Sequence, residues 1–121
     1  MLFGRKNKKA QGDPAPSFTI SIPYSKNFRG FKRMKLTTYQ DPLVDMDAIR
    51  NAPDPKEVLF EEYLYPDTPP LMRVSADGMR LGTIWSYYSE EYYEAIRSGR
   101  ISAVSLGLSE NDVFLFLKVN K

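Results

Sequence analysis

The sequence predicts an α+β, mainly β fold, in which a small, strongly bent sheet or partly open β-barrel of about six strands carries a capping helix and a second short helix. The first observation is Asp77-Gly78 between two alternating runs. This dipeptide is a strong hairpin signal, because both turn positions require positive φ. The second is the recurrence of short runs rich in β formers, and the third is a segment, residues 89–98, with helix start and stop signals.

The hairpin of residues 71–85 is the centre of this prediction. A two-residue turn places its apolar side chains mainly on one face, in the facing pairs Ala76 with Met79, Val74 with Leu81 and Met72 with Thr83. The opposite face then carries Arg73, Ser75, Arg80 and Gly82. We expect function on this polar face.

The front of the chain is basic and the rest is acidic. Through Lys35 there are nine Lys and Arg residues against one Asp, and from Leu36 onward eight basic residues stand against fourteen acidic ones. Residues 1–16 have little apolar area, so we expect a disordered basic arm there and a single domain over residues 17–121. The basic front fits attraction to phosphates or to an anionic surface. A tail that serves solubility, or that folds back on the acidic body, gives the same pattern.

Cysteine and histidine are absent. Their absence excludes disulfides, thiolate zinc sites, cysteine nucleophiles, histidine-containing triads and histidine metal sites. We therefore expect a protein that is not an enzyme and that holds no cofactor. No apolar run reaches the roughly 20 residues of a membrane span, and no apolar segment follows the charges at the start of the chain. These features predict a soluble, cytoplasmic protein.

Residues 18–22 alternate and predict a strand that Pro23 ends, and residues 31–39 predict a second strand. One face of the second strand mixes aromatic and basic side chains, namely Phe31, Arg33, Lys35, Thr37 and Tyr39. Such a face suits single-stranded nucleic acid, since a ring can stack on a base while Lys or Arg binds phosphate. An edge strand protected by charges has the same pattern.

A short helix is expected from Asp41-Pro42, with Asp41 as its N-cap and Leu43, Met46 and Ile49 at helical spacing. The nearby carboxylates of Asp41, Asp45 and Asp47 raise the question of a metal site. The segment lacks the glycine and the closing glutamate of a calcium loop, so we expect no metal.

Residues 57–65 are rich in β formers and predict a strand with Val58, Phe60 and Leu64 inward. The alternation breaks at Glu61-Glu62, where we expect a bulge.

The helix predicted over residues 89–98 starts at Ser89 and stops at Gly99. Tyr88, Tyr92 and Ile96 lie on one stripe, which we expect to pack on the sheet, although a stack of tyrosines can also serve as a platform for bases. Two final strands follow, over residues 101–107 and 113–119. The second of them is apolar on both faces, which is typical of a central strand.

The order of features from about Lys32 to Leu106 resembles the HIRAN domain, a small β-barrel module of some helicase-like DNA repair proteins that also occurs as a stand-alone bacterial protein. The matching features are a short strand at Leu71–Val74, a turn at Asp77-Gly78, a strand containing glycine at Leu81–Ile84 and a helix at Tyr88–Ser98. The resemblance implies a HIRAN-like barrel, related in shape to SH3 and OB barrels.

HIRAN domains of the repair type bind ends of single-stranded DNA through aromatic and polar residues of the first strand and of an Asn-Pro-Tyr-Asp loop. Tyr39 stands where the first-strand aromatic of the family would fall. The loop here reads Tyr65-Pro66-Asp67-Thr68-Pro69-Pro70, so Tyr65 and Asp67 match the family loop in composition and not in position.

Our leading hypothesis is a small non-enzymatic module that binds single-stranded DNA or RNA. Gly82, which has no side chain, would let a backbone approach closely. Phosphates would bind Lys32, Arg33, Lys35, Arg73 and Arg80, and bases would stack on Tyr39 and Tyr65. The alternative is a protein-interaction or structural module, which predicts an exposed apolar patch containing Trp85 or Tyr87. Catalysis would have to rely on carboxylates such as Glu61 and Glu62, which an unbulged strand points to opposite faces.

Overall fold

The computed structural model describes residues 15–39 and 41–120 of the chain. Within these ranges the elements are β1 (Phe18–Pro23), β2 (Lys32–Lys35), α2 (Met46–Asn51), β3 (Glu57–Tyr63), β4 (Leu71–Ala76), β5 (Met79–Trp85), α3 (Glu90–Arg97), β6 (Ile101–Leu108) and β7 (Val113–Val119). The prediction of a mainly β, α+β fold with two short helices is therefore confirmed. The basic arm expected at residues 1–16 lies, except for residues 15 and 16, outside the described residues.

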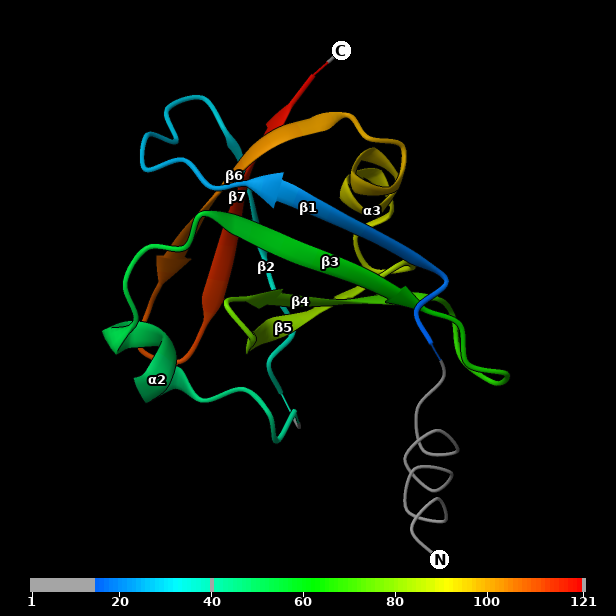
Figure 1. The fold of residues 1–121 in the computed structure, drawn as a ribbon. Coiled ribbons are helices and arrows are strands. Elements are labelled where there is room, and N and C mark those ends of the chain that lie inside the picture. The colour runs from blue at the N-terminus through cyan, green and yellow to red at the C-terminus, as the bar shows by residue number, and fades with distance from the viewer. Residues whose placement is uncertain (1–14, 40, 121) are drawn as a thin grey trace, which may run out of the picture.

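The strands form two antiparallel sheets, with the orders β1-β3-β4-β5 and β2-β7-β6. Single bridges join the sheets where Thr37 pairs with Thr83 and where Tyr24 pairs with Val104. The fold is thus two bent sheets linked at their margins, and the sheets do not close into a barrel. Strand β7 is the middle strand of its sheet, as its apolar sequence predicts. Figure 1 shows the two helices at opposite ends of the sheets.

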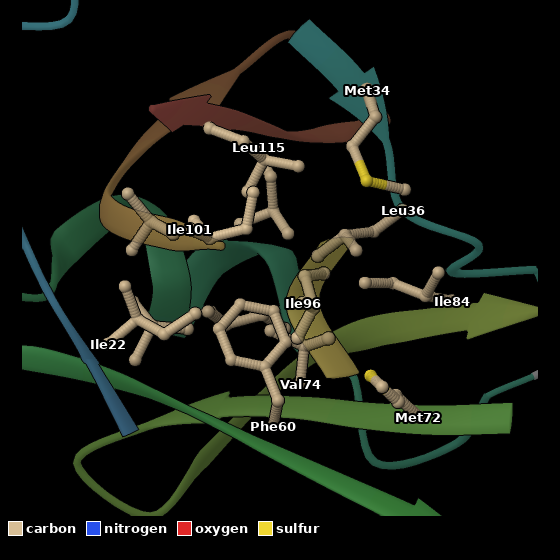
Figure 2. Packing of buried hydrophobic residues seen from close by; sticks show 14 of the residues in the cluster. Ile22, Met34, Leu36, Phe60, Met72, Val74, Ile84, Ile96, Ile101 and Leu115 are labelled. Atoms are coloured by element: carbon tan, nitrogen blue, oxygen red, sulfur yellow. The ribbon is translucent and has the colours of Figure 1, made fainter. Parts of the chain in front are cut away.

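The hydrophobic core fills the space between the two sheets. Figure 2 shows Ile22, Phe60 and Val74 from the first sheet pointing toward the same interior as Leu115 of the second. All four of these side chains are essentially inaccessible to solvent. Burying one such side chain stabilises a fold by roughly 1.5–3 kcal/mol, so this shared core is what holds the two sheets together.

The hairpin turn forms as predicted, and its pairing shifts farther along the strands. Asp77 and Gly78 have φ values of 52° and 79°, which a two-residue primed turn requires. Ala76 faces Met79 as expected, but Val74 faces Gly82. The register shifts between Val74 and Ser75, so β5 contains one extra residue, and the predicted facing pairs beyond the shift are wrong.

The bulge expected at Glu61-Glu62 is wrong, because β3 pairs in continuous register with both of its neighbours. Alternation therefore turns Glu62 inward, where its side chain is buried. Hydrogen bonds from neighbouring side chains compensate for this burial, which sequence alternation cannot reveal. Leu64 is also not inward, since it follows the end of β3 and is mostly exposed.

The first helix starts later than predicted. Asp45 is its N-cap, and the Asp45 side chain accepts a hydrogen bond from the backbone N–H of Ala48 at 3.1 Å. Asp41 instead accepts a hydrogen bond from Arg80, five residues before the helix begins at Met46. Leu43 consequently lies outside the helix and is exposed.

The second helix is close to its predicted bounds, and Gly99 follows it with a φ of 78°. Ser89 occupies the N-cap position, but its side chain makes no capping hydrogen bond. The predicted stripe is wrong at Tyr88, which lies before the helix and is 76% exposed. Ile96 is buried as predicted, and Tyr92 is partly buried against the core. Tyr93 and Ala95 complete the buried face of the helix.

Candidate ligand-binding groove

The segment after β2 is attached to the edge of β5 by one pair of residues. Thr37 and Thr83 exchange two backbone hydrogen bonds, each 2.9 Å between nitrogen and oxygen. This pair fixes residues 36–39 alongside the end of β5. Two parts of the chain more than 40 residues apart in sequence therefore meet at one surface.

Gly82 makes this approach possible. A Cβ atom at this position would lie 2.7 Å from the Cβ of Leu36 and 3.1 Å from the carbonyl oxygen of Thr37. Its φ of 155° is also one that residues with a side chain rarely adopt. The backbone that Gly82 admits is thus this chain's own segment at residues 36–37, whereas the sequence suggested the backbone of a ligand.

The two parts enclose a surface hollow of about 320 Å³ at the end of β5. Its aromatic lining comes from Tyr39 of the first part and from Trp85, Tyr87 and Tyr88 of the second. Tyr39, Tyr87 and Tyr88 are 79%, 62% and 76% exposed, so their rings remain open to solvent. The ring centroids of Trp85 and Tyr87 are 5.8 Å apart, and those of Tyr87 and Tyr88 are 6.3 Å apart.

Two further hollows continue this surface. A hollow of about 240 Å³ shares Thr37, Tyr39 and Trp85 with the first and extends to Arg73 and Asp41. The next, of about 310 Å³, shares Asp41, Pro42 and Arg73 with its neighbour. Its other lining residues are Leu43, Tyr63, Tyr65 and Arg80. Because neighbouring hollows share residues, we call this row the groove.

One carboxylate lies among the guanidinium groups of the groove. Asp41 Oδ2 accepts a hydrogen bond from Arg80 Nη1 at 2.8 Å and lies 3.9 Å from Arg73 Nη1. Arg73 Nη1 also donates to the hydroxyl oxygen of Thr83 at 2.7 Å. The Asp41 side chain is only 8% exposed, so this acid offsets one of the two arginine charges at short range.

A second polar cluster lies beneath α3 and connects β3 to the helix. Glu62 Oε2 accepts hydrogen bonds from the Tyr93 hydroxyl at 2.7 Å and from Arg97 Nε at 3.1 Å, and Ser17 donates to Glu62 Oε1 at 2.9 Å. Burial by itself would raise the pKa of Glu62, but the bonds from Tyr93, Arg97 and Ser17 outweigh it and hold the pKa below its ordinary value. Burial and the adjacent carboxylate together raise the pKa of Tyr93. This cluster fastens the helix to the sheet.

Most of the predicted site residues line the groove, namely Lys35, Tyr39, Tyr65, Arg73 and Arg80. Lys32 and Arg33 are exposed on β2 away from it. The guanidinium of Arg33 lies 5.1 Å from the ring centroid of Phe114, on the outer side of the second sheet. The predicted basic face of β2 is therefore divided, and only its end at Lys35 reaches the groove.

Sequence reasoning placed two groove residues in structural roles. Tyr88 was expected on the packed stripe of the helix, and Asp41 was expected to cap the first helix. The signal for Tyr88 is its position directly before Ser89-Glu90-Glu91, which puts it outside the first helical turn. The position of Asp41 depends on Arg80, whose separation of 39 residues leaves no local sequence signal.

No metal site emerges from residues 15–39 and 41–120, where no three Asp or Glu side chains gather closely enough to hold an ion. No helix in these ranges is both long enough and apolar enough to cross a membrane.

The sequence and the fold were compared with known proteins. No protein-family model matches the sequence, and no curated protein or solved structure matches it. The resemblance to the HIRAN domain therefore stays a prediction, and the geometry of the groove is what supports a function.

Proposed function

We propose that this protein is a small, non-enzymatic module that binds single-stranded nucleic acid in the groove. One observation carries the proposal. Solvent-exposed tyrosines line one end of the groove, and guanidinium groups line the other; the tyrosines are Tyr39, Tyr87 and Tyr88. Nonspecific single-strand binding commonly combines rings that stack on bases with cations that follow the phosphates.

The aromatic end offers stacking surface rather than core packing. Tyr39, Tyr87 and Tyr88 all line the first hollow, and each of these residues is more than half exposed. A base placed among them would cover ring surface that water now covers, and stacking of this kind contributes roughly 1–3 kcal/mol per base. Lys35 lies at the same hollow and can bind the adjoining phosphate.

Binding is expected to depend on the rings of the groove. Tyr39→Ala and Tyr88→Ala should each weaken binding of a fluorescently labelled oligothymidylate by about 1–3 kcal/mol, or roughly 5-fold to 150-fold in Kd, because each removes a stacking partner. Fluorescence anisotropy at low salt measures the effect. Circular dichroism should show both variants folded, since both side chains are largely exposed.

Phe28→Ala is the matched control for lost aromatic surface. Phe28 is 45% exposed and packs against Phe116 with a distance of 4.5 Å between ring centroids, outside the groove. It should leave the affinity nearly unchanged. Equal losses in all three variants, or no binding by the unmodified protein at low salt, would contradict the proposal.

Lysines on one strand provide a second comparison. Lys35→Ala should reduce the affinity and make the dependence of log K on log salt shallower by about 0.7, the value for one phosphate contact on a single strand. Lys32→Ala removes the same charge from the same strand, away from the hollows, and should change the slope less.

A protein partner is the second candidate function. The observation that favours it is the charge balance of the groove, where Asp41 and Asp112 oppose Lys35, Arg73 and Arg80. An aromatic groove with little net charge can hold an extended, proline-rich peptide. Affinity for such a peptide that is insensitive to salt, without affinity for oligothymidylate, would favour this candidate.

A further inference from the structure

Asp41 occupies the place in the groove where an anionic group of a ligand would bind. Its Oδ2 atom is 2.8 Å from Arg80 Nη1 and 3.9 Å from Arg73 Nη1. Two guanidinium groups around one oxyanion are the arrangement by which proteins hold carboxylates and phosphates. The site for an anion is thus already built, and this chain fills it with its own carboxylate.

The surroundings of Asp41 show that its carboxylate is turned into the groove. The Asp41 side chain is 8% exposed, whereas Tyr39 before it and Leu43 after it are 79% and 63% exposed. The side chains of Arg73 and Arg80 are 29% and 20% exposed, so both remain partly accessible to solvent. A ligand can therefore reach both guanidinium groups from outside.

Asp41 also lies at the boundary between two hollows. It lines the hollow that contains Tyr39 and Trp85 and also the hollow that contains Tyr65 and Arg80. A nucleic-acid strand that extends from the aromatic end of the groove toward Tyr65 must pass this carboxylate. The carboxylate repels phosphate and pairs with the arginines that would otherwise bind the phosphate.

The remaining bonds of Asp41 are local. Its Oδ1 accepts the backbone N–H of Leu43 at 3.1 Å, and its own backbone N–H donates to the carbonyl oxygen of Thr38 at 3.2 Å. The contacts of the carboxylate with Arg73 and Arg80 are made between side chains. No backbone hydrogen bond of the sheets takes part in them. Exchange of this carboxylate for a phosphate thus leaves the sheet pairing intact.

We propose that Asp41 is a built-in competitor for the phosphate site formed by Arg73 and Arg80, and that it limits the affinity of the groove for single strands. This inference rests on the proposed function. When a strand binds along the whole groove, one phosphate replaces the carboxylate beside the arginines. Asp41 then opposes the charge of that phosphate and limits how strongly the groove binds it and how strongly binding responds to salt.

The test compares Asp41→Asn with Asp45→Asn by anisotropy with labelled oligothymidylate across a range of salt concentrations. Asp41→Asn keeps the oxygen that accepts from Leu43 and removes the charge beside Arg80. Asp45→Asn removes the same charge four residues later, and asparagine is as good an N-cap as aspartate, so α2 is preserved.

We expect Asp41→Asn to bind about 5-fold more tightly than Asp45→Asn at low salt, because no carboxylate competes with the phosphate for the arginines. Its dependence of log K on log salt should be steeper by up to about 0.7, the value for one phosphate contact, since Asp41 no longer opposes the charge of that phosphate. Equal affinities and slopes for the two variants, with the unmodified protein binding, would overturn the role of Asp41 and leave the proposed function in place. Absence of binding by all three proteins would remove both.

A measurement on the unmodified protein covers the case in which Asp41→Asn does not fold. The carboxyl ¹³C resonance of Asp41 should shift when oligothymidylate saturates the protein, because the carboxylate loses its contact with Arg80. The resonance of Asp45 should stay in place. If Asp41 does not shift while the protein is saturated, the carboxylate remains beside the arginines and the inference is wrong.

Discussion

Gly82→Ala should lower the free energy of unfolding by about 3 kcal/mol, since substituting a residue at a positive φ costs roughly 1–3 kcal/mol and overpacking a filled site adds a similar amount. The added Cβ would lie 2.7 Å from the Cβ of Leu36, on a backbone with φ of 155°. Either β5 must twist or the segment at residues 36–37 must move outward. Urea unfolding followed by circular dichroism measures the loss.

Gly78→Ala separates the two causes. Gly78 has a φ of 79°, but a Cβ there meets open space among the described residues. Its cost should be limited to about 1 kcal/mol from the left-handed backbone. Hydrogen exchange adds a local readout, because Gly82→Ala should speed exchange of the Thr37 and Thr83 amides and Gly78→Ala should not. Similar losses of stability in the two variants would contradict the packing argument.

Glu62→Gln should lower the free energy of unfolding at neutral pH by about 1.5–3 kcal/mol, the range for hydrogen bonds made to a charged group. The carboxylate accepts from Tyr93, Arg97 and Ser17 while only 2% of the residue is exposed. The amide offers one acceptor oxygen in place of two and presents an N–H group to another donor. Glu61→Gln, on the opposite side of the same strand, should change stability by no more than about 0.5 kcal/mol.

The effect of Glu62→Gln should depend on pH in a defined direction. The pKa of Glu62 is lower in the folded protein than its ordinary value of 4.5, so near and below that value the unfolded chain binds more protons at this site. Its stabilising contribution is complete above about pH 4.5 and is lost as the pH falls through the folded pKa. The stability difference between the unmodified protein and Glu62→Gln should therefore shrink from pH 7 to pH 3. A difference that is constant over this range would show that Glu62 is not held ionised.

Local patterns were sufficient for most of the architecture. The Asp77-Gly78 turn, the two final strands and the stop at Gly99 each depend on residues within a few positions of one another. Turn geometry, alternation and helix termination are local properties, so sequence reasoning reaches them. The same applies to Val58 and Phe60, whose burial follows from alternation in β3.

The errors share a physical cause, which is an interaction with a distant part of the chain. Glu62 points inward because α3 brings Tyr93 and Arg97 to it. Asp41 does not cap the first helix, because its carboxylate pairs with Arg80. By local rules, a buried charge is unfavourable and an aspartate before proline caps a helix. Neither rule takes account of a distant side chain that binds the carboxylate.

For the groove, too, the sequence predicts the residue types but not how they are assembled. The residue types, such as Tyr39, Tyr65 and the hairpin arginines, could be selected from the sequence because stacking and phosphate binding require those side chains. Their assembly could not, because it depends on the register shift in the hairpin and on the approach of Leu36 and Thr37 to Gly82.

By itself the sequence determined most of the secondary structure, the turn and the chemistry that the surface can offer, because these follow from backbone conformation and side-chain type over short spans. Only the tertiary structure decided which rings face one another, which arginines are neutralised and which acid is buried. Those outcomes depend on distances of a few ångströms between segments tens of residues apart, where contact geometry decides the balance between burial, charge and hydrogen bonding.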